Sequence, residues 1–576
     1  MAFRAMDDAT IRDANSWLYI DPDVPNSLPF SVLPEGGFYR ETKYRMNSWD
    51  FRATANYNDV YNEDHIVNAF GGMEVSSTDR GRTFFTGVGH LYDFGNISNY
   101  DYHYFKQSDE EGSPYYYLTY TYGRDVAFFG TATYSWKGRY TVNGTMRYEG
   151  SNRLGKATSA RWLPTWNISA AWNAHEEPWF HKTFNNKLSH ATLKASYSLT
   201  GDKPAVTNAT TIYYSSVTWR PNSADQETYI GVSRPANPFL TYEKKHELNI
   251  GLDLGFLANR INVAFDWYTR NNYDLIGMHY GTGTDSGDIA KQMNVASMKS
   301  NGEELSISTK NIVTKDFQWN TDFIFSHTNT KVTDLKTRTR VIDLIWGGGF
   351  TMEGYPYRSL FSMDFQGLNE KGLPTFINEN GELTVSDIYF QSNNIDYLKY
   401  EGPTDPPITG SLGNSLTYKN WHLNVFMTYA FGNVVRLDPA FYSSYSDLSA
   451  MPKEFKNRWV VAGDEAITNI PVIADLRLLQ QDSYISYAYN AYNRSTVRVA
   501  KGDFIRLKEV SLGYDFPKKW INTIGLTSAS AKLQATNLFL IYSDKKLNGQ
   551  DPEFFNSGGV ATPMARQFTF TLRLGL

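Results

Sequence analysis

A strict alternation of apolar and polar residues, repeated along most of the chain, constrains its fold more than any other feature. Between residues 247 and 256 every even-numbered position holds Leu, Ile or Phe, and the odd-numbered positions hold Glu, Asn, Gly or Asp. Because successive side chains of a strand point to opposite faces, this segment predicts a β-strand with one apolar and one polar side. The short connection 257–260 and a second alternating run from Ile261 predict a hairpin.

The pattern recurs often enough to predict roughly sixteen to eighteen strands, and no long amphipathic helix is evident. The clearest further runs are 128–136, 140–148, 162–173, 317–326, 412–418 and 421–431. The tight connections are 137–139, 257–260, 311–316 and 419–420. The long ones are about 74–115, 333–408 and 434–496. Short turns at one end of the strands and long loops at the other are typical of outer-membrane barrels.

Strand length separates a membrane barrel from a soluble β protein. A sandwich or propeller uses strands of about 5–6 residues, whereas a strand that crosses a bilayer needs about 9–11. The runs here have the greater length, which favours an all-β fold, an antiparallel transmembrane β-barrel. Aromatic residues beside the turns predict girdles at the membrane interfaces, namely Trp136 and Tyr140, Trp267 and Tyr268, and Tyr418 and Trp421. The final run 567–576 also alternates and ends on Leu576, where outer-membrane proteins usually have an aromatic residue.

Composition excludes several other classes of protein. The formal net charge of −5 gives no global attraction to nucleic acid, and the absence of cysteine excludes disulfides, thiolate metal sites and thiol catalysis. No window approaches 18 consecutive apolar residues, so no transmembrane helix is expected. Asp7 and Asp8 interrupt any apolar core of a signal peptide. We therefore expect either a cytosolic chain or one whose natural start lies elsewhere.

Adjacent carboxylates are the strongest indication of catalysis in the sequence, and this indication is weak. Glu176-Glu177 and Asp109-Glu110-Glu111 could suggest a glycosidase, but sequence neighbours on a strand face opposite sides and loop acids are usually solvated. Gly281–Gly287 is rich in glycine but precedes no helix, so it is a poor phosphate cradle. We expect no catalytic residue, no cofactor-binding residue and no cofactor.

The histidines and the aromatic loops offer little more. The ten histidines show no metal-ligand spacing, so no metal site is expected, and His246 and His422 are predicted to face the barrel lumen. Aromatic faces stack on sugar rings, so three loop segments are candidates for binding a polymer: Tyr115–Tyr122, Trp346–Phe350 and Tyr442–Tyr445. Ordinary loop packing explains these segments equally well, and the substrate-binding residues stay unassigned.

Several segments together resemble one family of transporters. Asp503–Pro517, which contains Arg506-Leu507-Lys508, is similar to the RLKN-x-x-LGY-x-x-P strand of SusC/RagA-type TonB-dependent outer-membrane transporters. Arg147–Gly155 resembles the RYDGSSRFG loop of that family, and Asn301–Leu305 resembles its NKGVEL segment. Further matches are Trp162–Pro178, Lys194–Gly201, Glu243–Asp253, Ala535–Phe539 and Gly549–Glu553. These matches follow the order of the family and cover most of residues 47–576.

The resemblance implies a fold and a function. The family barrel has 22 strands and is preceded by a signal peptide, a small β-sandwich domain, a TonB-contacting segment and a plug, none of which this sequence matches. The chain is therefore expected to be the C-terminal portion of such a barrel, with residues 1–46 as an irregular segment and residues 47–576 as a partial barrel with long extracellular loops. By itself it is expected not to close a barrel of the family type.

The implied activity is TonB-dependent import of a bulky nutrient, a glycan or an oligopeptide, across the outer membrane of a Gram-negative, Bacteroidetes-like cell. The implied partners are a SusD-like surface lipoprotein, TonB–ExbB–ExbD acting through the N-terminal part, and outer-membrane lipid. No enzymatic activity and no nucleic acid are expected. The alternatives are a surface glycan-binding or adhesin barrel that does not transport and, ranked last, a soluble β-rich carbohydrate enzyme.

Overall fold

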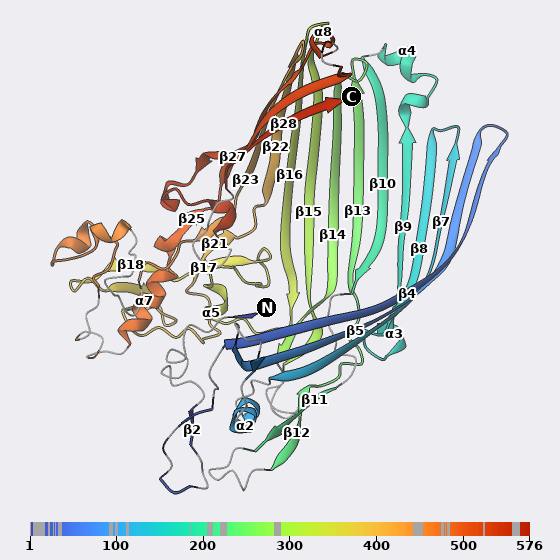
Figure 1. Ribbon diagram of the computed structural model, residues 1–576. Coiled ribbons are helices and arrows are strands. Elements are labelled where there is room, and N and C mark those ends of the chain that lie inside the picture. Colours follow the sequence, from blue (N-terminus) through green and yellow to red (C-terminus); the bar gives the residue numbers. More distant parts are fainter. Residues whose placement is uncertain are drawn as a thin grey trace.

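The computed structural model is dominated by one large antiparallel sheet (Figure 1). It describes residues 2–3, 18–20, 24–26, 28, 30–32, 37–91, 96–97, 102–110, 115–185, 187–203, 211–218, 227–280, 290–441, 453–473, 477, 480, 484–521, 523, 525–555 and 565–575. The sheet has 17 strands, of which β1 (Ala2–Phe3) and β6 (Asn96–Ile97) have two residues each. In the described residues, no helix is both long and apolar enough to cross a bilayer.

The remaining fifteen strands form the wall, and each pairs with the next along the chain. They are β4 Gly37–Tyr61, β5 His65–Leu91, β7 Tyr116–Trp136, β8 Tyr140–Ser151, β9 Trp162–Asn173, β10 Leu188–Asp202, β13 Glu243–Phe256, β14 Ile261–Tyr280, β15 Ala290–Val313, β16 Phe317–Leu335, β22 Ile408–Tyr418, β23 Trp421–Phe431, β26 Phe504–Asp515, β27 Ser528–Ser543 and β28 Gln567–Gly575. This confirms the predicted all-β antiparallel architecture.

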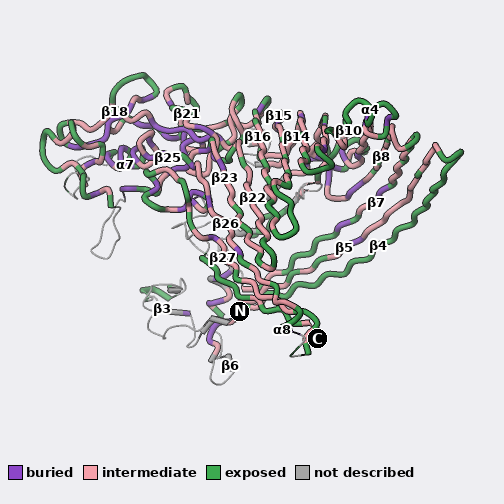
Figure 2. The backbone as a smooth tube through the Cα atoms, turned by 90° about the horizontal axis from the view of Figure 1, so that it is seen from above, coloured by how far each residue is buried: buried purple, intermediate pink, exposed green. Residues whose placement is uncertain are grey.

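The wall is open rather than closed. One end is β4, whose long register is with β5, and the other end is β28, which pairs with β27. No register joins β4 to β28 in the described part of the chain, and their residues are exposed on both faces along most of each strand. Figures 1 and 2 show the strands as a curved sheet with two free sides.

The two faces of the wall differ in chemistry. On β7, Phe128, Tyr134 and Trp136 are exposed on one face, and Thr131 and Thr133 lie on the other. The same holds on the last strand, where Phe568, Phe570, Leu572 and Leu574 are all more than half exposed. A continuous exposed apolar face of this kind is stable only against lipid.

The connections have the predicted asymmetry, but the long connection predicted at about 74–115 is wrong over residues 74–91, which continue β5 as a paired strand. Tight turns lie at the end of the wall where α8 (Lys518–Ile521) and the C-terminus are found, and the long connections leave from the other end (Figure 1). The turn after β13 is tight because Leu257, Ala258 and Asn259 all adopt positive φ, between 51° and 60°. In barrels of this type the tight turns face the periplasm, so the long connections are extracellular.

Two long connections fold into a lobe with its own core. This loop lobe comprises the described parts of residues 336–407 and 432–503, and buried residues gather there in Figure 2. Its elements are α5 Val341–Leu344, β17 Ser359–Ser362, β18 Phe365–Leu368, β19 Pro374–Ile377, β20 Leu383–Thr384, β21 Lys399–Pro403, β24 Val434–Arg436, η4 Lys453–Asn457, η5 Asp464–Ala466, α7 Ile485–Asn493, η6 Thr496–Arg498 and β25 Val499–Lys501. Among the described residues, the largest apolar cluster lies in this lobe, outside the wall.

Short elements complete the fold. They are β2 Leu18–Tyr19, β3 Phe30–Ser31, α2 Tyr102–Glu110, α3 Thr158–Arg161, η1 Ala174–Glu176, α4 Phe180–Phe184, β11 Ile212–Val217, β12 Thr228–Arg234, η8 Lys545–Leu547 and η9 Pro552–Phe554. β11 and β12 form a separate hairpin on the extracellular side of the wall (Figure 1).

Three details of the prediction need correction. The boundary at residue 47 falls inside β4, which begins at Gly37, because charged residues hide the alternation there while pairing with β5 continues. Trp267 and Tyr268 lie within β14 rather than beside a turn, and Tyr268 is 3% exposed. His246 lies on the apolar face, because it faces Leu199 across the ladder and shares its parity with Leu248.

Candidate functional site

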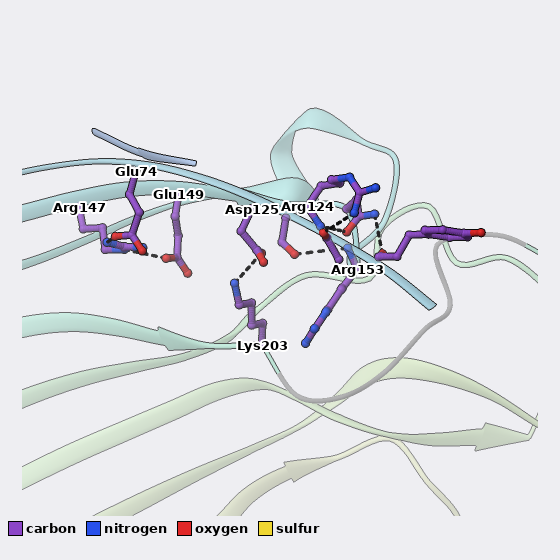
Figure 3. A network of polar contacts seen from close by, with 11 residues as sticks. Glu74, Arg124, Asp125, Arg147, Glu149, Arg153 and Lys203 are labelled. Atoms are coloured by element: carbon purple, nitrogen blue, oxygen red, sulfur yellow. Dashed lines mark hydrogen bonds and ion pairs between the residues drawn. The ribbon is translucent and has the colours of Figure 1, made fainter. Parts of the chain in front are cut away.

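The polar face of the wall carries a chain of ion pairs near its extracellular end (Figure 3). Arg147 of β8 lies 2.8 Å from Glu149 and 3.5 Å from Glu74 of β5. Asp125 of β7 lies 2.6 Å from Lys203, which follows β10. These side chains are only partly exposed, and each of the two cations is paired with at least one carboxylate. The wall therefore presents fixed positive and negative charges to the lumen on its polar side.

The segment 147–155, noted for its resemblance to a family loop, is mainly structural. Leu154 is fully buried and packs with Leu163 and Tyr242. A Cβ at Gly155 would lie 2.1 Å from the backbone oxygen of Pro238, so only glycine fits there. The motif therefore fastens the β8–β9 connection to the segment before β13.

Two other family segments, far apart in the sequence, meet in a buried ion pair. Arg506 of β26 donates from Nη2 to Asp551 Oδ1 at 2.5 Å, and both side chains are 4% exposed. Arg506 Nε also lies 3.2 Å from Glu553, and Asp551 Oδ1 accepts the backbone N–H of Glu553. This contact fixes the β27–β28 connection against the wall.

A polar hollow of about 440 Å³ lies on the same face of the wall, across β8, β9, β10, β13 and β14. Amides and hydroxyls line it, including Asn143, Asn167, Ser196 and Asn249. Lys194, at its edge, is paired with Asp253 at 2.5 Å. These groups can hydrogen-bond a polar segment or a hydroxylated ligand. Asp266 is the carboxylate among the residues that line the hollow.

The loop lobe depends on a buried arginine. Arg436 is 8% exposed and donates to the backbone oxygens of Phe361 and Ser495 and to the hydroxyl of Ser362. Burial lowers the pKa of Arg436 to about 9, against the opposing effect of the Glu401 carboxylate. The arginine ties β17 and β24 to the end of α7. The lobe is thus one packed unit rather than two independent loops.

The structure places the predicted polymer-binding segments in different parts of the molecule. Trp346 is 61% exposed and Phe350 is 39% exposed on the loop lobe, and the guanidinium of Arg494 lies 5.8 Å from the Trp346 ring. Tyr115–Tyr122 is mostly the start of β7, where Tyr116, Tyr120 and Tyr122 are exposed. Tyr442–Tyr445 lies outside the described residues. The glycine-rich segment Gly281–Gly287, judged a poor phosphate cradle, also lies outside them. Of the two segments that the structure describes, one lies on the loop lobe and the other on the wall strand β7.

His422 behaves as predicted, on the polar face. Its Nε2 lies 2.9 Å from Asp515 and its Nδ1 lies 3.2 Å from the Thr417 hydroxyl. Within the described residues, no group of three or more His, Asp or Glu side chains is arranged to hold a metal ion.

The two adjacent glutamates prove to have separate environments. Glu176 is 56% exposed and lies 3.6 Å from His175. Glu177 is 8% exposed and accepts hydrogen bonds from the Tyr140 hydroxyl at 2.6 Å and from the Trp172 indole at 3.3 Å. Glu177 therefore joins the β7–β8 turn to the β9–β10 connection and does not form an acid pair with Glu176.

The Glu177 contact predicts a pH-dependent contribution to stability. The Tyr140 hydrogen bond holds the pKa of Glu177 below its ordinary value. The stabilisation is therefore present above the ordinary glutamate pKa and is lost as pH falls through the lowered one. We expect Glu177→Gln to lower the melting temperature by about 1–3 °C at pH 7 and by less at pH 3. Glu176→Gln is the matched control, and an equal loss in both variants would contradict this role.

The comparisons with known proteins agree with this geometry. A family model described as TonB dependent receptor-like, beta-barrel, matches residues 8–538. The chain belongs to this family. Like the strand β4, the match begins before residue 47.

Relatives place the chain within the family. The TonB-dependent receptor SusC of Bacteroides thetaiotaomicron is 29% identical over 474 residues, which are 78% of this chain and 43% of that protein. TonB-dependent receptor P3 of Formosa agariphila is 24% identical over 453 residues, 74% of this chain and 42% of that protein. The chain is of the SusC/RagA type, and proteins of this type reside in the outer membrane of Bacteroidetes.

A solved structure shares the fold. The structure of the RagAB peptide transporter superposes with a TM-score of 0.74 at 21% identity and covers 93% of this chain and 56% of that one. The chain therefore spans about half the length of the relatives it matches. The curated relatives are named as receptors rather than as enzymes.

Proposed function

We propose that this chain supplies most of the barrel wall and the extracellular loops of a TonB-dependent importer for a bulky nutrient, a glycan or an oligopeptide. The observation that carries the proposal is the combination of an exposed apolar face with a polar face that carries a network of ion pairs. A lumen lined in this way suits a polar filling and a polar cargo.

The loop lobe supports the binding half of the proposal. Its buried core and the Arg436 contacts hold the exposed Trp346 and Phe350 in place above the wall. A rigid support reduces the ordering cost of binding. We propose that a SusD-like lipoprotein meets this extracellular side, and that TonB acts through a part of the complete protein outside this chain.

Uptake in cells with and without TonB tests the proposal. We expect accumulation of labelled cargo, screened as oligosaccharides and as oligopeptides, to fall to background when TonB is deleted, while binding to the cell surface persists. Uptake that continues without TonB would contradict the importer. Surface binding with no uptake in either strain would instead support the alternative, a surface glycan-binding or adhesin barrel.

A further inference from the structure

Four ring side chains form a cluster on the apolar face of the wall, away from the polar hollow. They are Trp166 of β9, Tyr197 of β10, His246 of β13 and Tyr273 of β14. Tyr197 and His246 have centroids 5.7 Å apart and planes within 12°, and His246 and Tyr273 have centroids 5.6 Å apart and planes within 11°. Trp166 lies 5.4 Å from Tyr197, edge to face. The cluster is thus a row of nearly parallel rings flanked by an indole.

The ladder registers place all four rings on the lipid side. Trp166 and His246 each lie directly opposite Leu199, on the two neighbouring strands. Tyr197 lies opposite Leu248 in the same ladder, and Tyr273 lies opposite Lys244, which is on the same face of β13 as His246. Directly paired residues share a face of a sheet, and this face continues into exposed apolar side chains such as Ile250, which is 41% exposed.

The height of the cluster follows from the length of β13. From His246 to Phe256, the last residue before the tight turn, the strand advances ten positions. At about 3.3 Å per residue and a tilt near 40°, this is roughly 25 Å across the membrane, the height of the apolar band of such barrels. The cluster therefore lies in the headgroup layer of the outer, extracellular leaflet.

The polar atoms of the cluster lie close together. The Tyr197 and Tyr273 hydroxyls lie 3.4 Å from the two ring nitrogens of His246, contacts long enough to leave both hydroxyls able to bind another partner. Lys244 lies 5.8 Å from the Tyr273 ring and is paired with Asp274 at 2.8 Å. The neighbouring carboxylate makes the cluster a poor site for phosphate.

We propose that this cluster binds the sugar headgroup of a glycolipid in the outer leaflet. The ring faces would contact the apolar face of the sugar, and the Tyr and His polar atoms would exchange hydrogen bonds with its hydroxyls. Ordinary interfacial aromatics are scattered, whereas here the hydroxyls of two tyrosines converge on one histidine. The ligand is a membrane lipid, so this proposal does not depend on the imported cargo.

Lipid retention by the native protein tests the proposal. The protein is extracted from outer membranes in detergent and exchanged with a diglucosyl diacylglycerol, or with phosphatidylethanolamine or phosphatidylglycerol of the same acyl chains. Bound lipid is then counted by native mass spectrometry. We expect the wild type to retain the glycolipid at least fivefold more than either phospholipid, and the triple variant Y197F/H246L/Y273F to lose that preference.

The control removes tyrosine hydroxyls at the opposite interface. The double variant Y418F/Y514F changes residues near the tight turn after β22, where Trp421 and Tyr514 are 4.6 Å apart, and it should keep the preference. Equal glycolipid retention by the triple variant, or stronger retention of phosphatidylglycerol, would overturn the proposal. The single variant Tyr197→Phe gives the same test with the smallest change and should lower the preference about two- to threefold.

Discussion

Expressed by itself, the 576-residue chain is expected to give no energised uptake and no closed barrel. The free sides of the wall are β4, with 25 residues, and β28, with nine. Apart from Phe38 and Tyr39 of β4, which pair with β1, each strand has one row of backbone N–H and C=O groups without a ladder partner in the described structure.

The energetics of those edges decide the outcome. Each unpaired backbone group in hydrocarbon costs several kcal/mol, so the two edges together cost on the order of tens of kcal/mol. This exceeds the roughly 5–15 kcal/mol by which folded proteins are usually stable. We therefore expect both edges to be paired in a functional barrel.

The measurement compares the chain alone with the chain supplied together with further barrel strands of a SusC/RagA-type transporter. Compactness in detergent is read from the gel mobility of unheated samples, and uptake is read with labelled cargo. We expect both to appear only with the added strands. Energised uptake by the chain alone would contradict the expectation, and the TonB-deleted strain is the control for leakage.

The largest effect of a single substitution is expected at Arg506. Arg506→Ala would leave Asp551 as an uncompensated charge in a place where both side chains are 4% exposed. Breaking a buried pair in this way typically costs about 3–5 kcal/mol. We expect a large fall in the urea concentration at which the protein unfolds in detergent, together with proteolysis in the β27–β28 connection.

A matched control lies on the neighbouring strand. Lys532 of β27 is 4.0 Å from Glu509 and both side chains are partly exposed, so Lys532→Ala should change stability by less than about 1 kcal/mol. Replacing both Arg506 and Asp551 by leucine should recover part of the loss, because no charge is then left unpaired. Equal effects of Arg506→Ala and Lys532→Ala would contradict the role assigned to the buried pair.

Much of the wall could be predicted from the sequence because successive side chains of a strand lie on opposite faces of the sheet. The hairpin at 257–260 and the outward positions of Phe128 and Phe570 follow from that rule alone. The same rule places His246 on the apolar face with Leu248, although its polarity had suggested the lumen. A histidine is tolerated between two tyrosines at the headgroup layer. The alternation therefore predicts the face of His246 better than the polarity of its side chain does.

Other features depend on contacts between distant segments, which periodicity does not report. Arg506 and Asp551 both lie in segments noted for their family resemblance, but nothing in their spacing shows that they meet. The loop lobe has short, irregular elements, so its core around Phe361 and Phe376 carries no regular pattern. For the same reason the sequence could not distinguish Trp346, exposed on a rigid support, from an aromatic residue in an ordinary loop.

The loop lobe has a consequence for how such a protein can change over evolutionary time. Its core combines Phe361 and Phe376 from one connection with Phe455 and Tyr492 from the other. Arg436 bonds to both connections. Replacing both connections together would therefore give a new recognition surface and leave the wall unchanged. Replacing one connection alone would remove half of the residues that form the common core. We therefore expect the two connections to change together among related proteins, even though a hairpin of the wall separates them in the chain.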